Sequence, residues 1–323
     1  MNYTYRELRP AGDVDGEWQC ADMSDDGNFL IVACALGRLY TSPDRGSTWT
    51  ERTPTGAADR NWRSVASNST GQILAACCAT VGSFPVISGV YISTNWGGSW
   101  TQYNPAGDGL YHFWASVAMD STGLKLIAGY ASGRLYTSTT TGVSWTERQP
   151  KGDDDGYWEA VASDSDGTVL VAGDNLGAVW ISTNSGAGWT ERRPNGVAVS
   201  NWLTVDVDDN GTNIIAGDYS DGAFLSTNGG VAWTPVLDMG FILSVGININ
   251  GITMLSGFES GRLYTSIDGG TTWIEELPAG NNDFSWELLS HNSTGSVCLA
   301  GYLSGRLYLL LRENAIRMII EQN

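Results

Sequence analysis

The chain has 323 residues, with 41 Gly, 14 Trp and only two Lys, and its formal net charge is −18. This charge argues against nucleic acid or an anionic membrane surface as the main partner. No apolar run approaches the roughly 18 residues of a membrane span, and no signal peptide is expected at the start of the chain. The five cysteines lie in apolar, strand-like segments, which favours buried thiols, kept reduced during synthesis in the cytoplasm, over a disulfide framework.

In chain order, the first recognisable element is a fragment, "YRELRP" at Tyr5–Pro10, that reads as the end of a longer phrase. The full phrase is "GRLYTSPDRGSTWTERTP", Gly37–Pro54, and it returns as "GRLYTSTTTGVSWTERQP", Gly133–Pro150. A chain that repeats such a phrase is typically building one structural unit several times.

Two tryptophan series give the period of this unit. The first, in the phrase itself, recurs every 40 to 51 residues at Trp49, Trp100, Trp145, Trp189, Trp233 and Trp273. The second runs in phase with it, at Trp18, Trp62, Trp114, Trp158, Trp202 and Trp286, with Ile242 in the vacant position. The second series therefore has seven registers and the first has six.

Each unit divides into four short strands separated by Gly, Asn, Asp and Ser turns; in the second unit these are "WRSVASN", "QILAACC", "GVYIST" and "SWTQYNP". Four short strands per period of about 44 residues are typical of a propeller blade. The last unit, "GYLSGRLYLLL" at Gly301–Leu311, lacks its fourth strand, which Tyr5–Pro10 can supply. The prediction is an all-β fold: a single seven-bladed β-propeller over residues 1–311, with four antiparallel strands per blade, closed by the N-terminal strand, and a tail at 312–323.

The turn inside the phrase carries a known pattern. Ser42–Trp49, "SPDRGSTW", and Ser266–Trp273, "SIDGGTTW", match S-x-D-x-G-x-[ST]-W, so the chain resembles the Asp-box (BNR-repeat) propellers along almost its whole length. In the other copies the Asp is replaced, by Asn95, Thr140, Asn184 and Asn228. Asp or Asn at this position accepts backbone N–H groups, and Gly takes the positive φ. In Asp-box families this turn lies at the blade periphery, away from the substrate face, so a structural role is expected.

Asp-box propellers include sialidases, xyloglucan-type glycoside hydrolases, a photosystem II assembly factor, sorting receptors and phage proteins. Sialidases have six blades, an arginine triad and an R-I-P motif; this chain has seven registers and no R-I-P, and its arginines recur with the repeat. Xyloglucan-type enzymes place their cleft between two propellers, whereas the repeats of this chain predict a single propeller. The photosystem II factor is similar in blade number, but its basic binding surface is not expected on a chain of charge −18.

Candidate ligand residues lie in the long polar loops that follow each "ERxP"-like segment. An indole beside carboxylates is typical of saccharide recognition, because sugar C–H faces stack on rings and hydroxyls need polar partners. The candidates are Trp18, Trp62, Trp114, Trp158, Trp202, Trp286, Asp15, Asp59, Asp108, Asp155 and Asp283. The alternatives are that the indoles pack between blades and that the carboxylates form turns. Asp153–Asp155 lacks the spacing of an EF-hand, and no metal or cofactor is predicted.

Three further features bear on function. The arginines of "GRL" (Arg38, Arg134, Arg262, Arg306) and of "WTER" (Arg52, Arg148, Arg192) are expected to bridge neighbouring blades to carboxylates. An insertion around Phe84 and the nearby Tyr111 and His112 break the repeat and are further candidates for ligand contact. The apolar tail after Leu311 packs under the propeller or docks to a partner, including a second copy of the chain.

No Ser–His–Asp, Cys–His, H-E-x-x-H, C-x-x-C or phosphate-loop pattern is present. The sequence therefore favours a non-catalytic recognition module that binds a glycan at repeated blade junctions. The alternative is a structural or adhesive protein, such as a phage-tail or cell-surface component, that binds a protein. A glycoside hydrolase, which needs two carboxylates about 5–10 Å apart, is a second alternative. The location is not predicted, and a virion or cell surface stays open.

Overall fold

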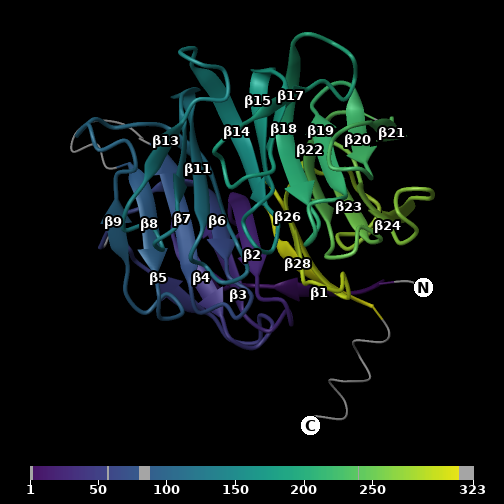
Figure 1. Cartoon of the computed structure of the whole chain (residues 1–323). Coiled ribbons are helices and arrows are strands. Elements are labelled where there is room, and N and C mark those ends of the chain that lie inside the picture. Colours follow the sequence, from purple (N-terminus) through teal and green to yellow (C-terminus); the bar gives the residue numbers. More distant parts are fainter. Residues whose placement is uncertain (1–2, 57, 80–87, 239, 313–323) are drawn as a thin grey trace.

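The structure, a computed structural model, describes residues 3–56, 58–79, 88–238 and 240–312. These residues form 28 β-strands and no α-helix, and successive strands pair in antiparallel fashion around a ring (Figure 1). The chain is an all-β propeller, as the repeat predicts. No helix that could span a membrane is found in the described ranges.

The pairings divide the described strands into seven groups of four, which we number as blades 1 to 7 along the chain. Blade 1 comprises β2 (Trp18–Met23), β3 (Leu30–Cys34), β4 (Leu39–Ser42) and β5 (Thr50–Arg52). Blade 2 comprises β6 (Asn61–Ser67), β7 (Leu74–Ala79), β8 (Gly89–Ser93) and β9 (Thr101–Tyr103). Blade 3 comprises β10 (Trp114–Met119), β11 (Leu126–Gly133), β12 (Leu135–Ser138) and β13 (Thr146–Arg148).

The remaining blades follow the same order. Blade 4 comprises β14 (Gly156–Ser163), β15 (Leu170–Gly177), β16 (Val179–Ser182) and β17 (Thr190–Arg192). Blade 5 comprises β18 (Ser200–Val207), β19 (Ile214–Asp218), β20 (Gly222–Ser226) and β21 (Thr234–Leu237). Blade 6 comprises β22 (Ile242–Ile247), β23 (Met254–Phe258), β24 (Leu263–Ser266) and β25 (Ile274–Glu276). Blade 7 comprises β26 (Trp286–His291), β27 (Val297–Tyr302), β28 (Leu307–Arg312) and β1 (Tyr3–Leu8).

The two ends of the described chain meet in blade 7. Strand β1 pairs antiparallel with β28, from Tyr3 opposite Arg312 to Leu8 opposite Leu307, and the two run side by side in Figure 1. The last strand thus extends one residue beyond the predicted boundary at Leu311. The remaining tail, 313–323, and the insertion around Phe84 lie outside the described residues.

A second ring of contacts closes the propeller around its axis. Just after the first strand of each blade, one backbone N–H donates to the carbonyl of the equivalent residue in a neighbouring blade. The Asp25 N–H donates to the Ser69 carbonyl, and the Ser69 N–H donates in turn to the Ser121 carbonyl. The series continues through Ser165, Asp209, Ile249 and Ser293, and the Ser293 N–H donates back to the Asp25 carbonyl. Because every member both donates and accepts, these groups are satisfied without leaving the ring.

Burial follows strand position within each blade. The second strands are the most buried, and all six residues of β7 are buried, whereas the fourth strands, such as β5, face outward with exposed Thr and Glu. The hydrophobic core is made between blades: Trp202 of blade 5 packs with Val171 and Val179 of blade 4. Ile242, which stands in the vacant tryptophan register, is likewise fully buried.

The turns that resemble the Asp-box pattern have the hydrogen bonds expected of them. Asp44 accepts the backbone N–H of Thr48 at 2.7 Å, and the Ser42 hydroxyl donates to Asp44 and accepts the N–H of Gly46. Asn184 accepts the N–H of Gly188 in the same way, so an amide replaces the carboxylate without changing the turn. The residue after the Asp, or after the Asn or Thr that replaces it, has a positive φ in every described copy: Arg45, Trp96, Thr141, Ser185, Gly229 and Gly269.

Candidate functional site

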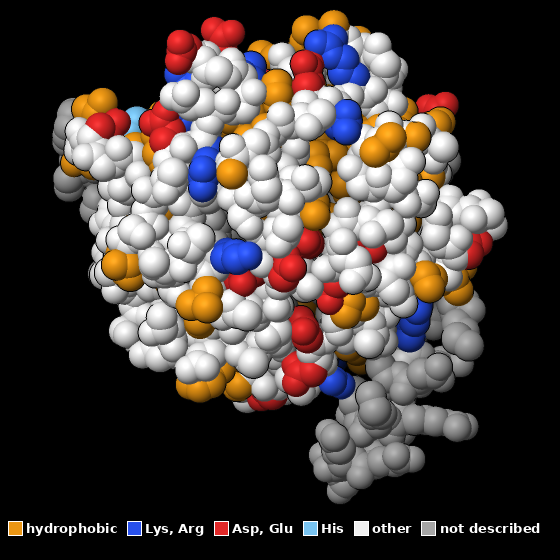
Figure 2. Space-filling model, viewed as in Figure 1, with side chains coloured by type: hydrophobic (Ala, Val, Ile, Leu, Met, Phe, Trp, Pro, Cys, Tyr) orange, Lys and Arg blue, Asp and Glu red, His pale blue; other side chains and the backbone are white. Residues whose placement is uncertain are grey.

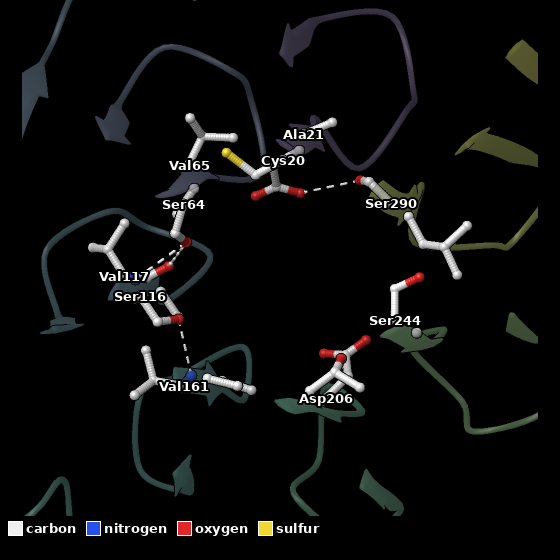
Figure 3. Close-up of a pocket in the computed structure, with 18 of the residues that line it drawn as sticks. Cys20, Ala21, Ser64, Val65, Ser116, Val117, Val161, Asp206, Ser244 and Ser290 are labelled. Atoms are coloured by element: carbon white, nitrogen blue, oxygen red, sulfur yellow. Dashed lines mark hydrogen bonds between the residues drawn. The ribbon is translucent and has the colours of Figure 1, made fainter. Parts of the chain in front are cut away.

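Two kinds of connection share one side of the propeller, which we call the loop face: those between the second and third strands of a blade, and those from each fourth strand to the next blade. Backbone bonds join the two kinds, as between Gly37 and Arg60 and between Gly261 and Phe284. The other two turns of each blade form the opposite turn face, where the Arg45 N–H donates to the Asn28 carbonyl. A central channel of about 850 Å³ runs between the first strands of the seven blades (Figure 3).

The six candidate tryptophans lie inside the blades' packing, not on the loop face. Trp18, Trp62, Trp114, Trp158, Trp202 and Trp286 are each at most 2% exposed. Three of their indole N–H groups tie neighbouring blades together: Trp18 donates to the Gly305 carbonyl, Trp62 to the Gly37 carbonyl and Trp158 to the Gly133 carbonyl, at 3.0, 3.2 and 2.8 Å. In this arrangement no face of these indoles is open to a sugar, so packing between blades explains them.

Four of the candidate aspartates hold the loops by pairing with the "GRL" arginines. The arginine Nε lies 2.6 Å from Asp59 in the Arg38 pair, 3.1 Å from Asp155 in the Arg134 pair, 2.8 Å from Asp283 in the Arg262 pair and 2.5 Å from Asp15 in the Arg306 pair. Arg134 also donates to three carbonyls of the loop it holds, those of Gly152, Asp153 and Asp154. The bridging expected of these four arginines is confirmed. The carboxylates themselves stay 58–60% exposed, so each pair contributes only about 0–1 kcal/mol to stability.

The same expectation is wrong for the "WTER" arginines. Arg52 and Arg148 each donate Nε to a threonine hydroxyl of their own blade, Thr41 and Thr137, at 2.7 Å. The Nε of Arg192 has no partner, and none of the three forms an ion pair with a described residue. The fourth strand points these side chains to the turn face, where the loop-face acids are out of reach.

The loop with Tyr111 and His112 is organised around Asp108. The Asp108 carboxylate accepts the Leu110 backbone N–H at 2.9 Å and lies 2.8 Å from His112 Nε2. Burial would raise the pKa of Asp108, but these hydrogen bonds outweigh it and lower the pKa. The His112 ring packs on Tyr130 at 4.3 Å, whereas Tyr111 points to solvent and is 55% exposed.

The channel wall is built from small side chains that sequence reasoning does not single out. Ser64, Ser116 and Ser244 each bond to the backbone of the next blade, and Figure 3 shows their hydroxyls around the channel. These serines and Thr204 occupy equivalent positions two residues after the buried Trp register. The sequence signal that could have predicted this wall is the recurrence of a small or hydroxyl-bearing residue two positions after the tryptophan register.

Three titratable groups meet inside the channel. Asp22 accepts the N–H groups of Met23 and Ser67, and Asp206 accepts those of Val207 and Ile247, so each carboxylate joins its blade to the next. His291 of blade 7 reaches Asp206 of blade 5, with 3.5 Å between Nε2 and the nearer carboxylate oxygen.

Gly246 of the intervening blade 6 makes this contact possible. A Cβ at Gly246 would lie 3.1 Å from the His291 ring. Burial raises the pKa of Asp22 to about 6. Burial by itself would lower the pKa of His291. The hydrogen bond to Asp206 and the negative charge of Asp206 outweigh this effect, so the pKa of His291 is raised.

The channel mouth on the loop face is mixed in character. Arg63 lies 3.7 Å from Glu159 and 5.5 Å from the centre of the Phe113 ring, and Gln19 donates to Glu287 at 3.3 Å. Leu36, Leu203, Leu243 and Leu303 also line this end. In Figure 2 acidic side chains gather over the region of β2, β26 and β28, in line with the acidic charge of the chain. Within the described ranges no cluster of His, Cys, Asp and Glu has the geometry of a metal site.

Exposed apolar side chains concentrate on the loop face. Twelve of the nineteen large apolar side chains that are exposed in the described residues lie in or beside its connections: Val14, Leu36, Leu110, Tyr111, Phe113, Tyr157, Leu176, Val197, Val199, Phe241, Leu277 and Leu303. Leu36 and Leu176 also have positive φ values, 54° and 82°, where blades 3, 6 and 7 have serine. A left-handed backbone costs a side-chain-bearing residue about 1–2 kcal/mol.

Comparison with known proteins identifies the fold. No protein-family profile matches the sequence, and no curated protein matches it. Among solved structures, the chain is similar to YCF48 bound to D1 peptide, with a TM-score of 0.72 and 15% identity over 97% of this chain and 98% of that one. It is also similar to YCF48 from Cyanidioschyzon merolae, with a TM-score of 0.70 and 14% identity over 96% and 99% of the two chains. At these identities the likeness is one of fold.

Proposed function

We propose that this chain is a non-catalytic, protein-binding propeller of the Asp-box type, and that it holds a segment of a partner protein on its loop face, at the channel mouth. The Asp-box assignment rests on the hydrogen-bonded turns around Asp44 and Asn184. The binding role rests mainly on the concentration of exposed apolar side chains on that face. A propeller of the same fold is described as bound to a peptide.

The two strained leucines are the sharpest support for this role. Leu36 and Leu176 are more than half exposed, so neither contributes to the core. The turn does not need them, because Ser132, Ser260 and Ser304 occupy the same position with similar φ values. Exposed patches of this kind mark binding surfaces, and a large side chain in a strained conformation points to a function outside folding.

Charge indicates the chemistry of the partner. The net charge of the chain is −18, and on the loop face Asp15, Asp59, Asp155 and Asp283 stay 58–60% exposed although each pairs with one arginine. A partner segment that complements this face carries Lys or Arg between large apolar side chains, and its association is faster at low salt.

The test is selection of random displayed peptides on the full chain, with two counter-variants. The first, Leu36→Ser with Leu176→Ser, takes residues already present in other blades; the second, Val231→Ser, removes an apolar side chain of the turn face. We expect enriched peptides that combine basic and apolar residues, bind at least tenfold more weakly to the leucine variant, and bind normally to the Val231 variant. No enrichment, or peptides indifferent to the leucine change, contradicts the proposal.

Glycan binding by the loop face is the weaker candidate, because the indoles expected to stack on a sugar are buried. Docking or self-association through the tail, 313–323, stays a prediction. Size-exclusion chromatography of the chain with and without these residues tests it, and an unchanged monomer counts against it.

A further inference from the structure

A second pocket, of about 400 Å³, opens on the turn face between blades 1 and 2. Its walls include Trp96 from blade 2 and Phe29, Pro43 and Arg52 from blade 1. It lies on the face opposite the proposed partner site, and neither depends on the other.

Trp96 sets this junction apart from the other five Asp-box turns. It stands at the positive-φ position, with φ of 56°, where blades 5 and 6 have Gly229 and Gly269. Its side chain is 47% exposed. The turn forms equally well around glycine, so folding does not require the indole, and a bulky residue with positive φ is strained.

Arg52 supplies the pocket with a positive charge that lacks a counter-charge. Its Nε donates to the Thr41 hydroxyl, and no carboxylate among the described residues pairs with the guanidinium. Burial lowers the pKa of Arg52, which reflects the cost of holding this charge partly away from water. The remaining guanidinium N–H groups are donors available to a ligand.

Asp26, the acid that lines this pocket, is already engaged. One of its carboxylate oxygens accepts the Ser24 hydroxyl and the Asn28 backbone N–H, and the other accepts the Asn28 side-chain amide. The charge of Arg45 also contributes to lowering the pKa of Asp26. Asp26 stays ionised, and its charge is offset by that of Arg45, whereas Arg52 has no carboxylate partner among the described residues. The ligand group that complements Arg52 is an anion.

We propose that this pocket binds a small carboxylate-bearing ligand, whose carboxylate pairs with Arg52 and whose ring or apolar part stacks on Trp96. Guanidinium and carboxylate match in a planar, two-point geometry, and an open indole face gives apolar contact next to it. A pocket of this volume is at the small end of the range for organic ligands. The carboxylate can belong to an acidic sugar or to the C-terminus of a peptide.

Blade 3 provides a matched control site. Arg148 donates to Thr137 as Arg52 does to Thr41, but the facing turn of blade 4 has Ser185 in place of Trp96. The arginine without the aromatic wall should not bind the same ligands.

The experiment is titration calorimetry of the full chain with galacturonate and with N-acetylphenylalanine, which separate the two sources of the carboxylate. Galactose and N-acetylphenylalaninamide are the matched neutral compounds. We expect at least one acid to bind at least tenfold more tightly than its neutral counterpart. Arg52→Gln and Trp96→Gly should each weaken this binding tenfold or more, and Arg148→Gln should leave it unchanged.

Trp96→Gly should keep or raise the melting temperature, because glycine adopts the positive φ without strain, so loss of binding in this variant cannot be put down to misfolding. The proposal is overturned if neither acid binds, if neutral compounds bind equally well, or if the Arg148 variant loses as much affinity as the Arg52 variant.

Discussion

Single residues in this chain divide between those that the repeat keeps and those that vary from blade to blade. Ser42 and Asp44 form a turn whose hydrogen bonds recur at Ser182 and Asn184, so these residues build the scaffold. Trp96 occupies an equivalent position to Gly229 and makes its turn no better. Residues such as Trp96, which differ from their equivalents in other blades without improving the turn, are the ones at which we expect ligand contacts.

Replacement of Asp44 separates its hydrogen bonds from its charge. Asp44→Ala removes the acceptor for the Thr48 N–H and hydroxyl and should lower the free energy of unfolding by about 1 kcal/mol. Asp44→Asn should cost a few tenths of that, because Asn keeps the turn in blades 2, 4 and 5. Urea denaturation of both variants measures the difference; equal losses would mean that the charge, and not the turn, matters.

The channel carboxylate Asp22 links stability to pH. Its pKa is raised by burial from 3.8 to about 6, so the folded chain binds more protons there than the unfolded chain between pH 4 and pH 6. The free energy of unfolding should therefore fall as the pH rises through this window, by on the order of 1 kcal/mol or more from this group.

Asp164, whose pKa burial also raises to about 6, and His291, whose pKa is raised, act in the same direction. Urea denaturation from pH 4.5 to 7.5 measures the slope, and Asp22→Asn should reduce it. A slope of the opposite sign, or one unchanged in the variant, contradicts the assignment.

Among the elements, the second and third strands of each blade are the most buried, while the loop-face connections are held by ion pairs. One such pair is unlike the exposed arginine pairs: Asp174, within β15, is 1% exposed and accepts from Lys151 at 2.9 Å and from the Tyr157 N–H at 2.8 Å. Lys151 comes from the loop between blades 3 and 4, so the contact holds that loop on blade 4.

Removal of one partner of this pair should be costly. Lys151→Met leaves a buried carboxylate without its cation and should lower the free energy of unfolding by about 2 kcal/mol, less than for a fully buried pair because the lysine is partly exposed. Asp174→Asn in the Lys151→Met background should recover part of this loss. Additive losses in the double-mutant cycle would mean that the two side chains are not coupled.

At the scale of the whole molecule, the ring is closed twice: by β1 on β28 and by the backbone bonds that run from Asp25 around to Ser293. Because blade 7 takes strands from both ends of the chain, the two ends cannot separate without unpairing β1 from β28. The pairing also covers the edge that β28 would otherwise leave open.

A circular permutant tests what this closure contributes. Arg312 and Tyr3 are opposite each other, so a short turn can join them while new ends are opened after Leu8, in the loop before Trp18. The permutant should fold with the same strand content but unfold faster, because blade 7 is then continuous in the chain. It contacts blade 1 through side chains, the Gly16–Gly305 backbone pair and the ring of backbone bonds, without a shared strand. Stopped-flow unfolding measures the rate; an unchanged rate would mean that β1 does not limit opening.

The sequence predicted the fold well because its evidence is local. Turn residues such as Gly46, the tryptophan registers and the fragment at Tyr5–Pro10 can be read along the chain without knowing any contact between blades. The pairing of Arg38 and Asp59 was also predictable, since both recur at fixed places in the repeat. The same reasoning failed for Arg52, because the side of the blade to which a side chain points decides its partner.

The sequence by itself determined an all-β propeller of repeated four-stranded units, because burial pattern, turn chemistry and period are properties of short segments. Only the tertiary structure decided that the candidate indoles are buried, that His291 reaches Asp206 across Gly246, and that Arg52 and Trp96 share a pocket. These contacts join different blades, and in a repeat protein equivalent residues have equivalent sequence signals. Which of them meet, and which face solvent, is decided by how the blades pack around the axis.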